Sequence, residues 1–242
     1  MRHIAAFSGG KDSTAMVLLL RETEPDLDFE CLFTPTGNEL PGVREHVASV
    51  CERIGARLVI PDGCGTLDSW IKHWKALPNW RQRWCTRQIK IVPCIAYLKA
   101  NPGSTLYVGL RADEEERQGL YGGHATYRYP LRERGYGLRE VWRIVDRYGF
   151  RIPKRTDCAV CFYQTINQWH DLWRDHPEEY QRGIAWEDET GFTFRSGGRD
   201  TWPASLRDLA AEFAAGRAPK GTEHSGQGAL FENGDECRVC RF

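Results

Sequence analysis

The sequence predicts an α/β fold with a parallel sheet that carries helices on both faces, followed by a mostly helical, cysteine-containing C-terminal part. Short apolar runs alternate with helical patterns from residue 2 to about residue 119, an alternation typical of a parallel sheet covered by helices on both faces. A Ser-Gly-Gly turn joins the first apolar run to the first helical segment, which predicts a strand-loop-helix opening. Beyond Gly119 the apolar residues recur at helical spacing, so we expect this half to be mostly helical.

Each element of the first half has its own signal. Apolar or β-rich runs predict strands at His3 to Phe7, Phe29 to Phe33, Arg57 to Ile60 and Thr105 to Leu110. Helices are predicted at Ser13 to Arg21, Pro41 to Gly55, Trp70 to Trp74 and Ile89 to Leu98. The second of these begins with proline and ends with glycine, which is the usual asymmetry of helix ends.

The second half carries two helical stripes and a glycine-rich segment. The stripes run from Leu138 to Tyr148 and from Trp169 to Trp173. Residues 218–235 hold four glycines and few apolar residues, which predicts a mobile linker. We therefore expect an α/β core at residues 1–119, a helical, basic part with a Cys-x-x-Cys pair packed on that core at residues 120–217, and a linker with a second such pair at residues 218–242.

Composition limits the classes of protein to consider. The chain has 33 Lys and Arg against 33 Asp and Glu, and 41% of its residues are hydrophobic. This balance fits a soluble α/β domain and excludes a disordered tail or a strongly basic nucleic-acid protein. The longest apolar runs fall far short of the roughly 18 residues of a membrane span, so no membrane partner is expected. The N-terminal apolar stretch is too short for a signal peptide, so we expect a cytoplasmic protein.

The string SGGKDS, Ser8 to Ser13, lies between the first predicted strand and helix. Successive backbone N–H groups and a helix N-terminus form an anion site there, suited to pyrophosphate or sulfate. Gly9 and Gly10 let the backbone approach the anion, Ser8 and Ser13 offer hydroxyl groups, and Lys11 adds a positive charge. The alternative is an ordinary glycine turn in which Ser13 caps the helix. The six residues together favour a phosphate loop, although their spacing is not that of a Walker A motif.

The SGGKDS string resembles the PP-loop of the adenine nucleotide α-hydrolase superfamily. Thr36-Gly37-Asn38-Glu39, after the second strand, resembles the D-T-G-x-E segment of phosphoadenosine phosphosulfate (PAPS) reductase-like proteins. Gly109 to Glu114, GLRADE, resembles their G-x-R-x-D-E segment. These three motifs stand in the family's order across about half of the chain. At position 35 the chain has Pro where the family often has Asp.

The resemblance implies an adenine nucleotide, ATP or PAPS/APS, laid across the carboxyl ends of the strands. Its phosphates would lie on residues 8–13 and its adenosine near Thr36, Gly37 and Glu39. Arg111 follows a predicted strand and would project into the same crevice, where it would neutralise a phosphate or sulfonate oxygen. Its alternative is a salt bridge with residues 113–116. Asp12 would orient Lys11 or hold the Mg²⁺ that accompanies ATP, or it is an acid that favours the helix N-terminus.

The cysteines form a second group of candidate site residues. Nine is an odd number, so a complete disulfide framework is impossible, and clustered cysteines in a reducing compartment indicate metal, cluster or redox chemistry. Four of them form two Cys-x-x-Cys pairs, Cys158 with Cys161 and Cys237 with Cys240. Cys85 lies among arginines at a predicted helix start, which would lower the pKa of its thiol. Cys31 and Cys51 fall in apolar patterns and are expected in the core.

We favour a 4Fe-4S cluster, because thiolate-only ligation with unrelated spacings suits it. Its ligands would be Cys85, Cys158, Cys161 and one of Cys237 or Cys240. Structural zinc bound by Cys158, Cys161, Cys237 and Cys240 is the alternative.

Assimilatory sulfonucleotide reductases and Dnd-type phosphorothioation sulfurtransferases resemble this pattern, since they combine a PP-loop domain with a Cys-ligated 4Fe-4S cluster. The reductases carry Cys-Cys where this chain has Cys85-Thr86. They also end in a Glu-Cys-Gly-Leu-His segment whose Cys attacks the sulfonate. Glu236-Cys237 resembles its start, which makes Cys237 a candidate nucleophile, while Cys240 stands where a different residue is expected and would be a cluster ligand.

A basic stretch from Arg128 to Arg155 holds nine Lys or Arg against three acids, interleaved with aromatic residues. Such a pattern suits single-stranded nucleic acid, whose phosphates pair with the cations and whose bases stack on the rings. We favour the alternative, a solvated helix whose aromatic residues are its core stripe, because Val141, Trp142 and Val145 have helical spacing. Nucleic acid remains a possible partner.

The resemblance implies an enzyme, and two chemistries fit. In the first, ATP is split to AMP and pyrophosphate, Lys11, Asp12 and Arg111 act on the phosphates, and the activated acceptor receives sulfur through the Cys centre. In the second, PAPS or APS is the substrate, and Cys237 takes its sulfonate and sulfite is released. A nucleotide-binding adaptor without turnover is a third alternative. Either enzyme requires a sulfur or electron donor protein.

Overall fold

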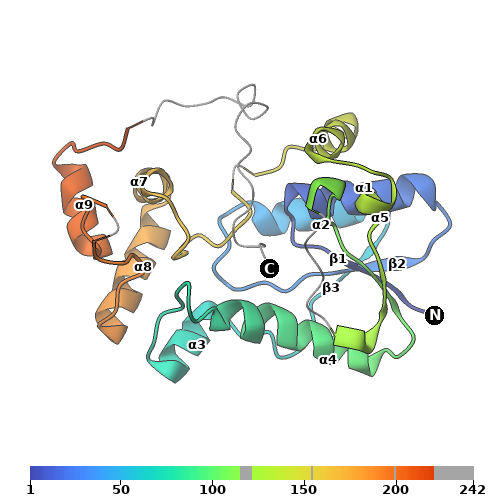
Figure 1. Ribbon diagram of the computed structural model, residues 1–242, viewed down its shortest axis with the longest axis horizontal. Helices are drawn as coiled ribbons and strands as arrows, with labels where there is room; N and C mark the ends of the chain where they lie inside the picture. Colours follow the sequence, from blue (N-terminus) through green and yellow to red (C-terminus); the bar gives the residue numbers. More distant parts are fainter. Residues whose placement is uncertain (115–121, 154, 199, 221–242) are drawn as a thin grey trace. The chain divides into compact units, whose positions relative to one another are not determined.

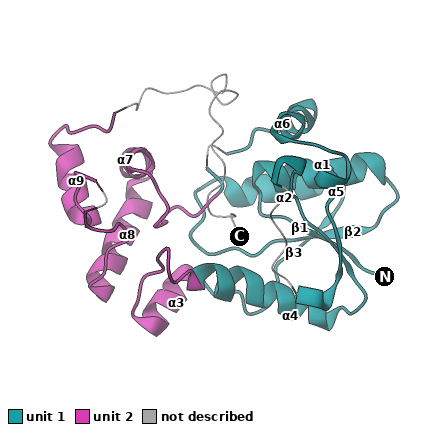
Figure 2. Ribbon diagram, viewed as in Figure 1, with its two compact units in different colours: residues 1–66, 85–156, 242 teal, residues 67–84, 157–241 magenta. Residues whose placement is uncertain are grey.

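The computed structural model describes residues 1–114, 122–153, 155–198 and 200–220 of the chain, which fall into two compact units (Figures 1 and 2). The first unit contains residues 1–66 and 85–156, and the second contains residues 67–84 together with the chain from residue 157. In the described residues, no helix has the length and apolar character needed to cross a membrane.

The first unit is built on one sheet of five parallel strands in the order β3-β2-β1-β4-β5. The strands are β1 (His3–Ala6), β2 (Phe29–Leu32), β3 (Arg57–Val59), β4 (Thr105–Tyr107) and β5 (Thr126–Arg128). The chain runs outward from β1 to β3 and then returns to the other side of β1, so the strand order reverses between β1 and β4. That reversal is where open α/β sheets bind ligands, at the carboxyl ends of the strands. The predicted parallel sheet is confirmed.

Helices cover both faces of this sheet, as predicted (Figure 1). One face carries α1 (Lys11–Thr23), α2 (Val43–Ile54), α5 (Pro130–Glu133) and α6 (Leu138–Arg147), and the other carries α4 (Val92–Ala100). Successive side chains of a strand point to opposite faces of the sheet. Ala5 therefore lies in the core beneath α1, whereas its neighbour Ile4 lies in the core beneath α4. Cys31 and Cys51 are buried in the α1 core, which confirms their expected core position.

Before α4 the chain forms a π-helical turn, η1 (Thr86–Ile91), so the helical stretch expected from Ile89 begins earlier. The expected boundary at residue 119 does not coincide with the division into units. β5 pairs with β4, and α6 packs on α1, so residues 122–153 join the first unit. Residues 67–84 belong to the second unit, where Trp186 Nε1 donates to Asp68 at 2.9 Å.

The second unit is helical, with α3 (Leu67–Trp74), α7 (Ile166–Asp175), α8 (Pro177–Thr190) and α9 (Leu206–Ala214). Trp169 and Tyr180 are fully buried, and their rings meet edge to face with centroids 6.2 Å apart. Glu187 organises the start of α9, because its carboxylate accepts the N–H groups of Phe194 at 2.8 Å and Leu206 at 2.7 Å. Two buried backbone donors are thereby satisfied by one side chain.

Candidate functional site

Three loops meet at the carboxyl edge of neighbouring strands. Residues 8–13 follow β1, residues 36–39 follow β2, and residues 109–114 follow β4. Parallel strands bring these ends to one edge of the sheet, on both sides of the point where the strand order reverses. The three sequence motifs therefore stand at one edge, as the sequence predicts.

The phosphate loop is held in shape by its own serines. Ser8 Oγ and Ser13 Oγ lie 3.1 Å apart, Ser13 Oγ donates to the Gly10 carbonyl at 3.1 Å, and the Gly10 N–H donates to Ser8 Oγ at 3.4 Å. Gly9 has a φ of +78°, and a Cβ there would lie 2.8 Å from Val47 on α2, so only glycine fits without movement. The two serine hydroxyl groups therefore stabilise the conformation of the loop.

The first turn of α1 directs its N–H groups into this loop. Gly10 precedes the helix without a side-chain cap, and the first intrahelical bond runs from the Thr14 N–H to the Gly10 carbonyl at 2.9 Å. The N–H groups of Lys11, Asp12 and Ser13 precede that bond, so they are the donors that a helix N-terminus presents to an anion. The arrangement has the chemistry of a phosphate site.

Asp12 joins the phosphate loop to the loop after β4. Arg111 Nη1 donates to the two Asp12 oxygens at 3.0 and 3.2 Å, and its Nε donates to Asp113 at 2.7 Å. The Lys11 Nζ donates to the same Asp12 carboxylate at 3.3 Å. Arg111 is 3% exposed. Burial alone would lower its pKa, but Asp12, Asp113 and Glu114 outweigh burial and raise the pKa of Arg111, so its guanidinium stays charged.

The loops also touch through backbone. A Cβ on Gly109 would lie 3.0 Å from the Asp12 carbonyl oxygen and 3.0 Å from the Ser13 Cα. Glycine at this position therefore lets the chain after β4 pass directly against the first turn of α1.

Thr36 to Glu39 form a closed turn. Glu39 Oε1 accepts both the Thr36 N–H, at 2.5 Å, and the Thr36 hydroxyl, at 2.6 Å. Glu39 Oε2 is buried, lies 3.7 Å from Arg44 Nη2 and accepts no hydrogen bond from the described residues. Gly37 has a φ of +68°, and a Cβ there would lie 2.9 Å from Thr66. One oxygen of Glu39 thus shapes the turn, and the other is left as an acceptor.

Two residues beside the phosphate loop lie outside the sequence motifs. His46 on α2 is 3.2 Å from the Thr14 hydroxyl through Nε2, and burial lowers its pKa, so it is neutral at neutral pH. The Thr156 hydroxyl lies 3.4 Å from where a Cβ on Gly10 would stand. The sequence carries no pattern that would identify either, because both contacts join residues far apart in the chain.

The cysteines expected to bind a metal divide between the units. Cys85 precedes η1 in the first unit, and Cys158 and Cys161 lie in the second, where neither is in a disulfide. Cys237 and Cys240 lie outside the described residues. Among the residues that the structure describes, no three His, Cys, Asp or Glu side chains gather as a metal site requires. The thiols present have the chemistry of iron-sulfur and zinc ligands.

A buried glutamine fixes the turn of the Cys158 pair. Gln164, 1% exposed, donates from Nε2 to the Ala159 carbonyl at 2.7 Å and accepts the Cys161 N–H at 3.4 Å. The Gln164 N–H in turn donates to the Cys161 carbonyl at 3.0 Å. The backbone between the two thiols therefore has one conformation that the side chain of Gln164 maintains.

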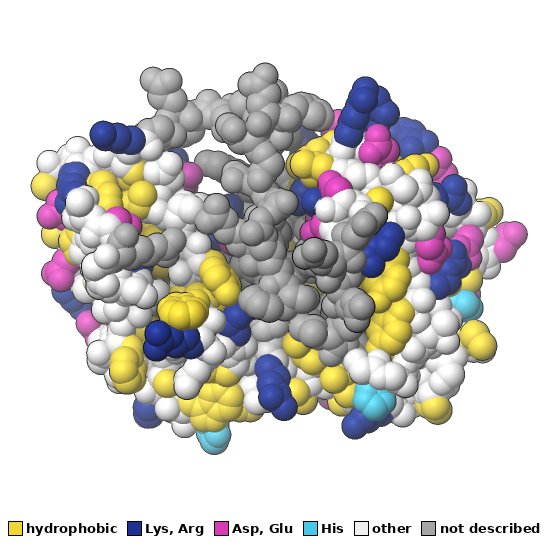
Figure 3. Space-filling view, viewed as in Figure 1, with side chains coloured by type: hydrophobic (Ala, Val, Ile, Leu, Met, Phe, Trp, Pro, Cys, Tyr) yellow, Lys and Arg dark blue, Asp and Glu magenta, His cyan; other side chains and the backbone are white. Residues whose placement is uncertain are grey.

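Some arginines of the basic stretch pair with acids within the first unit. Arg128 pairs with Glu24 and Glu133, and Arg147 pairs with Glu22. The residues on its helical face pack into the core beneath α6, among them Val141, Ile144 and Val145. Figure 3 shows acidic and basic side chains interspersed over the visible face. Val141 and Val145 thus lie in the core as the core-stripe alternative expects, whereas Trp142 is only half-buried and is not part of that core. Contact of this stretch with nucleic acid stays a prediction.

A comparison with models of known protein families gives a match that contains all three motifs. Residues 2–120 match the model of the phosphoadenosine phosphosulfate reductase domain family. No curated protein matches the chain. The solved structure of a phosphoadenylyl-sulfate (PAPS) reductase from Candida auris, in its phosphate complex, has a TM-score of 0.50 and 13% identity over 63% of this chain and 75% of that chain.

Two further solved structures show weaker likeness. The U34-tRNA thiolase NcsA from Methanococcus maripaludis, with its 4Fe-4S cluster, has a TM-score of 0.43 and 15% identity over 85% of this chain and 76% of that one. An NMN synthetase from Francisella tularensis has a TM-score of 0.44 and 16% identity over 93% and 88%. Residues 2–120, just under half of the chain, are thus similar to the phosphoadenosine phosphosulfate reductase domain family, and the motifs at residues 8–13, 36–39 and 109–114 lie within that match.

Proposed function

We propose that the protein binds ATP at the phosphate loop and splits it between its α- and β-phosphates, so that the AMP moiety passes to an acceptor and pyrophosphate leaves. Sulfur then replaces AMP on the activated acceptor with the help of a Cys-ligated iron-sulfur centre, and AMP is released. The observation that carries this proposal is the convergence of Lys11 and Arg111 on Asp12 at the N-terminus of α1. Two cations and the N-terminus of a helix meet at this carboxylate, and together they would stabilise the negative charge of bound phosphate groups.

The two cations differ in how firmly they are held. Arg111 is buried and donates to two carboxylates, so it is a fixed charge. Among the residues that the structure describes, Lys11 forms an ion pair with Asp12 alone, at 3.3 Å, and its side chain can turn to a phosphate oxygen when the nucleotide enters. The β- and γ-phosphates would then lie on the N–H groups of residues 11–13, where preorganised donors stabilise the charge that develops on leaving pyrophosphate.

The turn after β2 supports an adenosine beside the phosphates. The buried Glu39 Oε2 is an acceptor for a hydroxyl or amino group of the nucleoside, because its partner oxygen already holds Thr36. Arg44 pairs with this oxygen only at 3.7 Å, and a buried carboxylate oxygen without a hydrogen-bond donor is costly, so a ligand would supply the missing donor.

The Cys centre would be held by Cys85, Cys158, Cys161 and Cys240. A 4Fe-4S cluster supplies electron transfer or an iron that holds sulfur, and thiolate ligands fit it. We assign the cysteines to the same reaction as the nucleotide, because thiolates and a cluster would supply the sulfur or the electrons that this reaction needs.

A second candidate is a sulfonucleotide reductase that acts on PAPS or APS and uses Cys237 as nucleophile. The family of residues 2–120 favours it. A nucleotide-binding adaptor without turnover is the third alternative.

Phosphorus NMR of anaerobically purified protein with ATP and Mg²⁺ tests the proposal. AMP and pyrophosphate in the parent protein and in Lys75→Ala, but not in Lys11→Ala, support it, since Lys75 is an exposed lysine paired with Glu189. Sulfite release from PAPS or APS with a thiol reductant, without ATP cleavage, replaces it with the second candidate. Nucleotide binding in equilibrium dialysis with neither reaction leaves the adaptor.

Iron and acid-labile sulfide content tests the Cys centre. Cys158→Ser is expected to lose iron, whereas Cys31→Ala, in the sheet core, is expected to retain it. Equal iron content in the two variants, or zinc in place of iron, would contradict the 4Fe-4S assignment.

A further inference from the structure

Residues 69–112 contain eight Lys or Arg and no Asp or Glu, in a chain whose acidic and basic residues are equal in number. The first part of this segment, residues 69–84, belongs to the second unit and holds four of the nine tryptophans of the chain. Aromatic and basic side chains therefore alternate on one short stretch. Figure 3 shows hydrophobic side chains beside Lys and Arg over α3.

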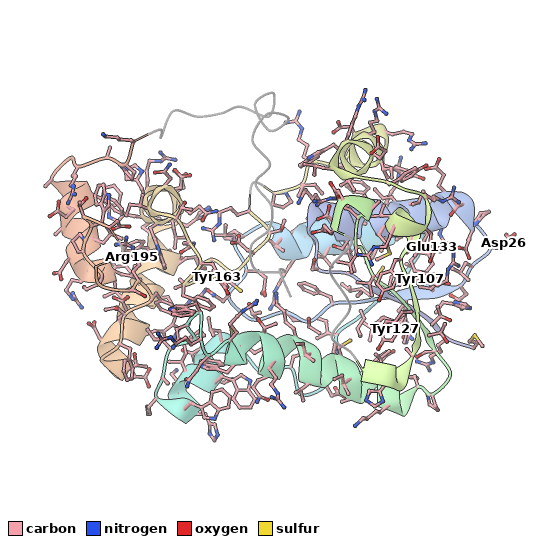
Figure 4. The ribbon with its side chains drawn as sticks, in the orientation of Figure 1. Asp26, Tyr107, Tyr127, Glu133, Tyr163 and Arg195 are labelled. Atoms are coloured by element: carbon pink, nitrogen blue, oxygen red, sulfur yellow. The ribbon has the colours of Figure 1, made fainter. Side chains whose placement is uncertain are left out.

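The tryptophans pack on one another at the end of α3. The Trp74 ring lies with its centroid 5.0 Å from that of Trp70 and meets Trp84 edge to face at 4.9 Å. Arg83, in the same loop, lies over the ring of Tyr163 at 5.2 Å (Figure 4). These contacts anchor both ends of the loop that joins α3 to η1.

Trp80 stands at the tip of that loop and is 60% exposed. The loop is closed by Asn79, whose Oδ1 accepts the N–H groups of Arg81 at 2.9 Å and Gln82 at 3.0 Å, while its own N–H donates to the Gln82 carbonyl at 3.2 Å. The hydrogen-bonded turn therefore fixes the backbone around Trp80 in a conformation that leaves its ring exposed to solvent.

One face of the Trp80 ring is covered by a cation. The Arg81 guanidinium lies 4.6 Å from the ring centroid, and within the described residues it forms no ion pair. By contrast, Lys72 and Lys75 nearby pair with Asp68 and Glu189. The surface therefore carries an uncompensated positive charge next to an exposed ring.

We propose that the surface formed by Trp74, Trp80 and Arg81 binds single-stranded nucleic acid, with a base stacked on Trp80 and a phosphate paired with Arg81. Stacking requires an unpaired base with an open face, which a duplex does not offer, and the free guanidinium matches a phosphate. Trp and Arg are also enriched at protein interfaces, so it is the absence of acids from residues 69–84 that favours a polyanion over a protein partner. The backbone charge of the ligand fits the absence of acids from residues 69–84, the part of the segment that carries this surface.

Fluorescence anisotropy with labelled oligonucleotides of about 12 nucleotides tests this, within the roughly 4–16 nucleotides that single-strand sites cover. The full chain is titrated with RNA, with DNA of the same sequence and with the matching duplex, at about 50 and 200 mM salt. Binding of either single strand in preference to the duplex is expected, and the two single strands distinguish RNA from DNA as the source.

Variants locate the surface. Trp80→Ala is expected to weaken single-strand binding about tenfold. Arg81→Gln is expected to weaken binding of all sequences and to reduce the slope of the logarithm of the binding constant against the logarithm of the salt concentration by about one. Phe192→Ala, an aromatic residue that is 58% exposed, and Arg207→Gln, which removes an exposed ion pair with Asp188, are the matched controls and should bind as the parent does.

Three outcomes would overturn the proposal. These are no binding of any single strand at micromolar protein, equal binding of duplex and single strand, or unchanged affinity in both Trp80→Ala and Arg81→Gln. Circular dichroism of the variants verifies folding, and the assay requires no turnover, so failure here leaves the nucleotide chemistry unaffected.

Discussion

The guanidinium of Arg111 donates to both oxygens of Asp12, at 3.0 and 3.2 Å, and so ties the loop after β4 to the first turn of α1. The two residues are 99 positions apart in the sequence. Because β1 and β4 are neighbours in the sheet, the ion pair joins the two loops on either side of the point where the strand order reverses. Its disruption should therefore affect nucleotide binding and the stability of the first unit together.

Replacement of Arg111 by lysine tests this link. Lysine cannot donate to Asp12 and Asp113 from one planar group, so we expect Arg111→Lys to lower the free energy of unfolding by about 1–3 kcal/mol and to weaken ATP binding. Urea denaturation and equilibrium dialysis measure the two effects. Arg147→Lys is the matched control, because Arg147 is 57% exposed and pairs only with Glu22, so its change should stay within about 0.5 kcal/mol. Equal effects in both variants would contradict a special role of the Asp12 pair.

A methyl group at position 109 should separate the same two segments. The Cβ of Gly109→Ala would lie 3.0 Å from backbone atoms of Asp12 and Ser13, which cannot turn away as a side chain would. Overpacking of this kind costs about 1–3 kcal/mol, and the displaced loop should bind nucleotide more weakly. Gly123→Ala, with nothing within 4 Å of the added methyl group, should leave both unchanged. Thermal unfolding with and without ATP distinguishes the variants.

The sequence predicts the sheet and the edge of the site because both depend on local signals. Apolar runs indicate the strands β1 to β4, and each motif follows its strand directly, so parallel pairing alone brings the motifs to one edge. β5 was not predicted, because Thr126–Arg128 is three residues long and has no apolar periodicity. For Arg111 the sequence predicts a place in the crevice, with a salt bridge to residues 113–116 as the alternative. The pair with Asp113 is present, whereas the pair with Asp12 depends on tertiary packing and has no local signal.

Two polar side chains in the second unit have no sequence signal at all. Gln164 and Glu187 are ordinary surface residue types, and nothing in their spacing predicts burial. Each is buried because it satisfies backbone groups of a loop, Gln164 at Ala159 and Cys161 and Glu187 at the start of α9. Such a role follows from where loops meet in space, which periodicity does not report.

The clamp of Gln164 on the Cys-x-x-Cys turn leads to a third prediction. Gln164→Leu would remove the donor to the Ala159 carbonyl and the side-chain acceptor of the Cys161 N–H in a buried position, at a cost of about 1–3 kcal/mol. We expect lower thermal stability of the second unit and less iron per chain in anaerobically purified protein. Gln181→Leu, on an exposed position of α8, is the control for the same substitution. Retention of full iron content in Gln164→Leu would show that the turn does not depend on the clamp.

The pH dependence of stability in the second unit should be dominated by Glu187. Burial, as the largest cause, raises the pKa of Glu187 from 4.5 to about 7, although the N–H groups of Leu206 and Phe194 act in the opposite direction. The folded chain then holds a proton that the unfolded chain has lost between about pH 4.5 and pH 7. The free energy of unfolding should therefore fall as pH rises through this window, by at most about 3 kcal/mol, and level off above it.

Comparison with Glu187→Gln isolates this contribution, because glutamine does not titrate. The variant loses one acceptor for the two N–H groups, so it is less stable than the parent at pH 5, and the difference should shrink toward pH 8 as the parent loses its proton. Urea titrations followed by the fluorescence of Trp169 and Trp186, both buried in this unit, give the two free energies at each pH. A difference between parent and variant that is constant from pH 5 to pH 8 would contradict the assignment. If the difference instead shrinks between pH 5 and about pH 7 and then levels off, the side chain of Glu187 is the group that titrates.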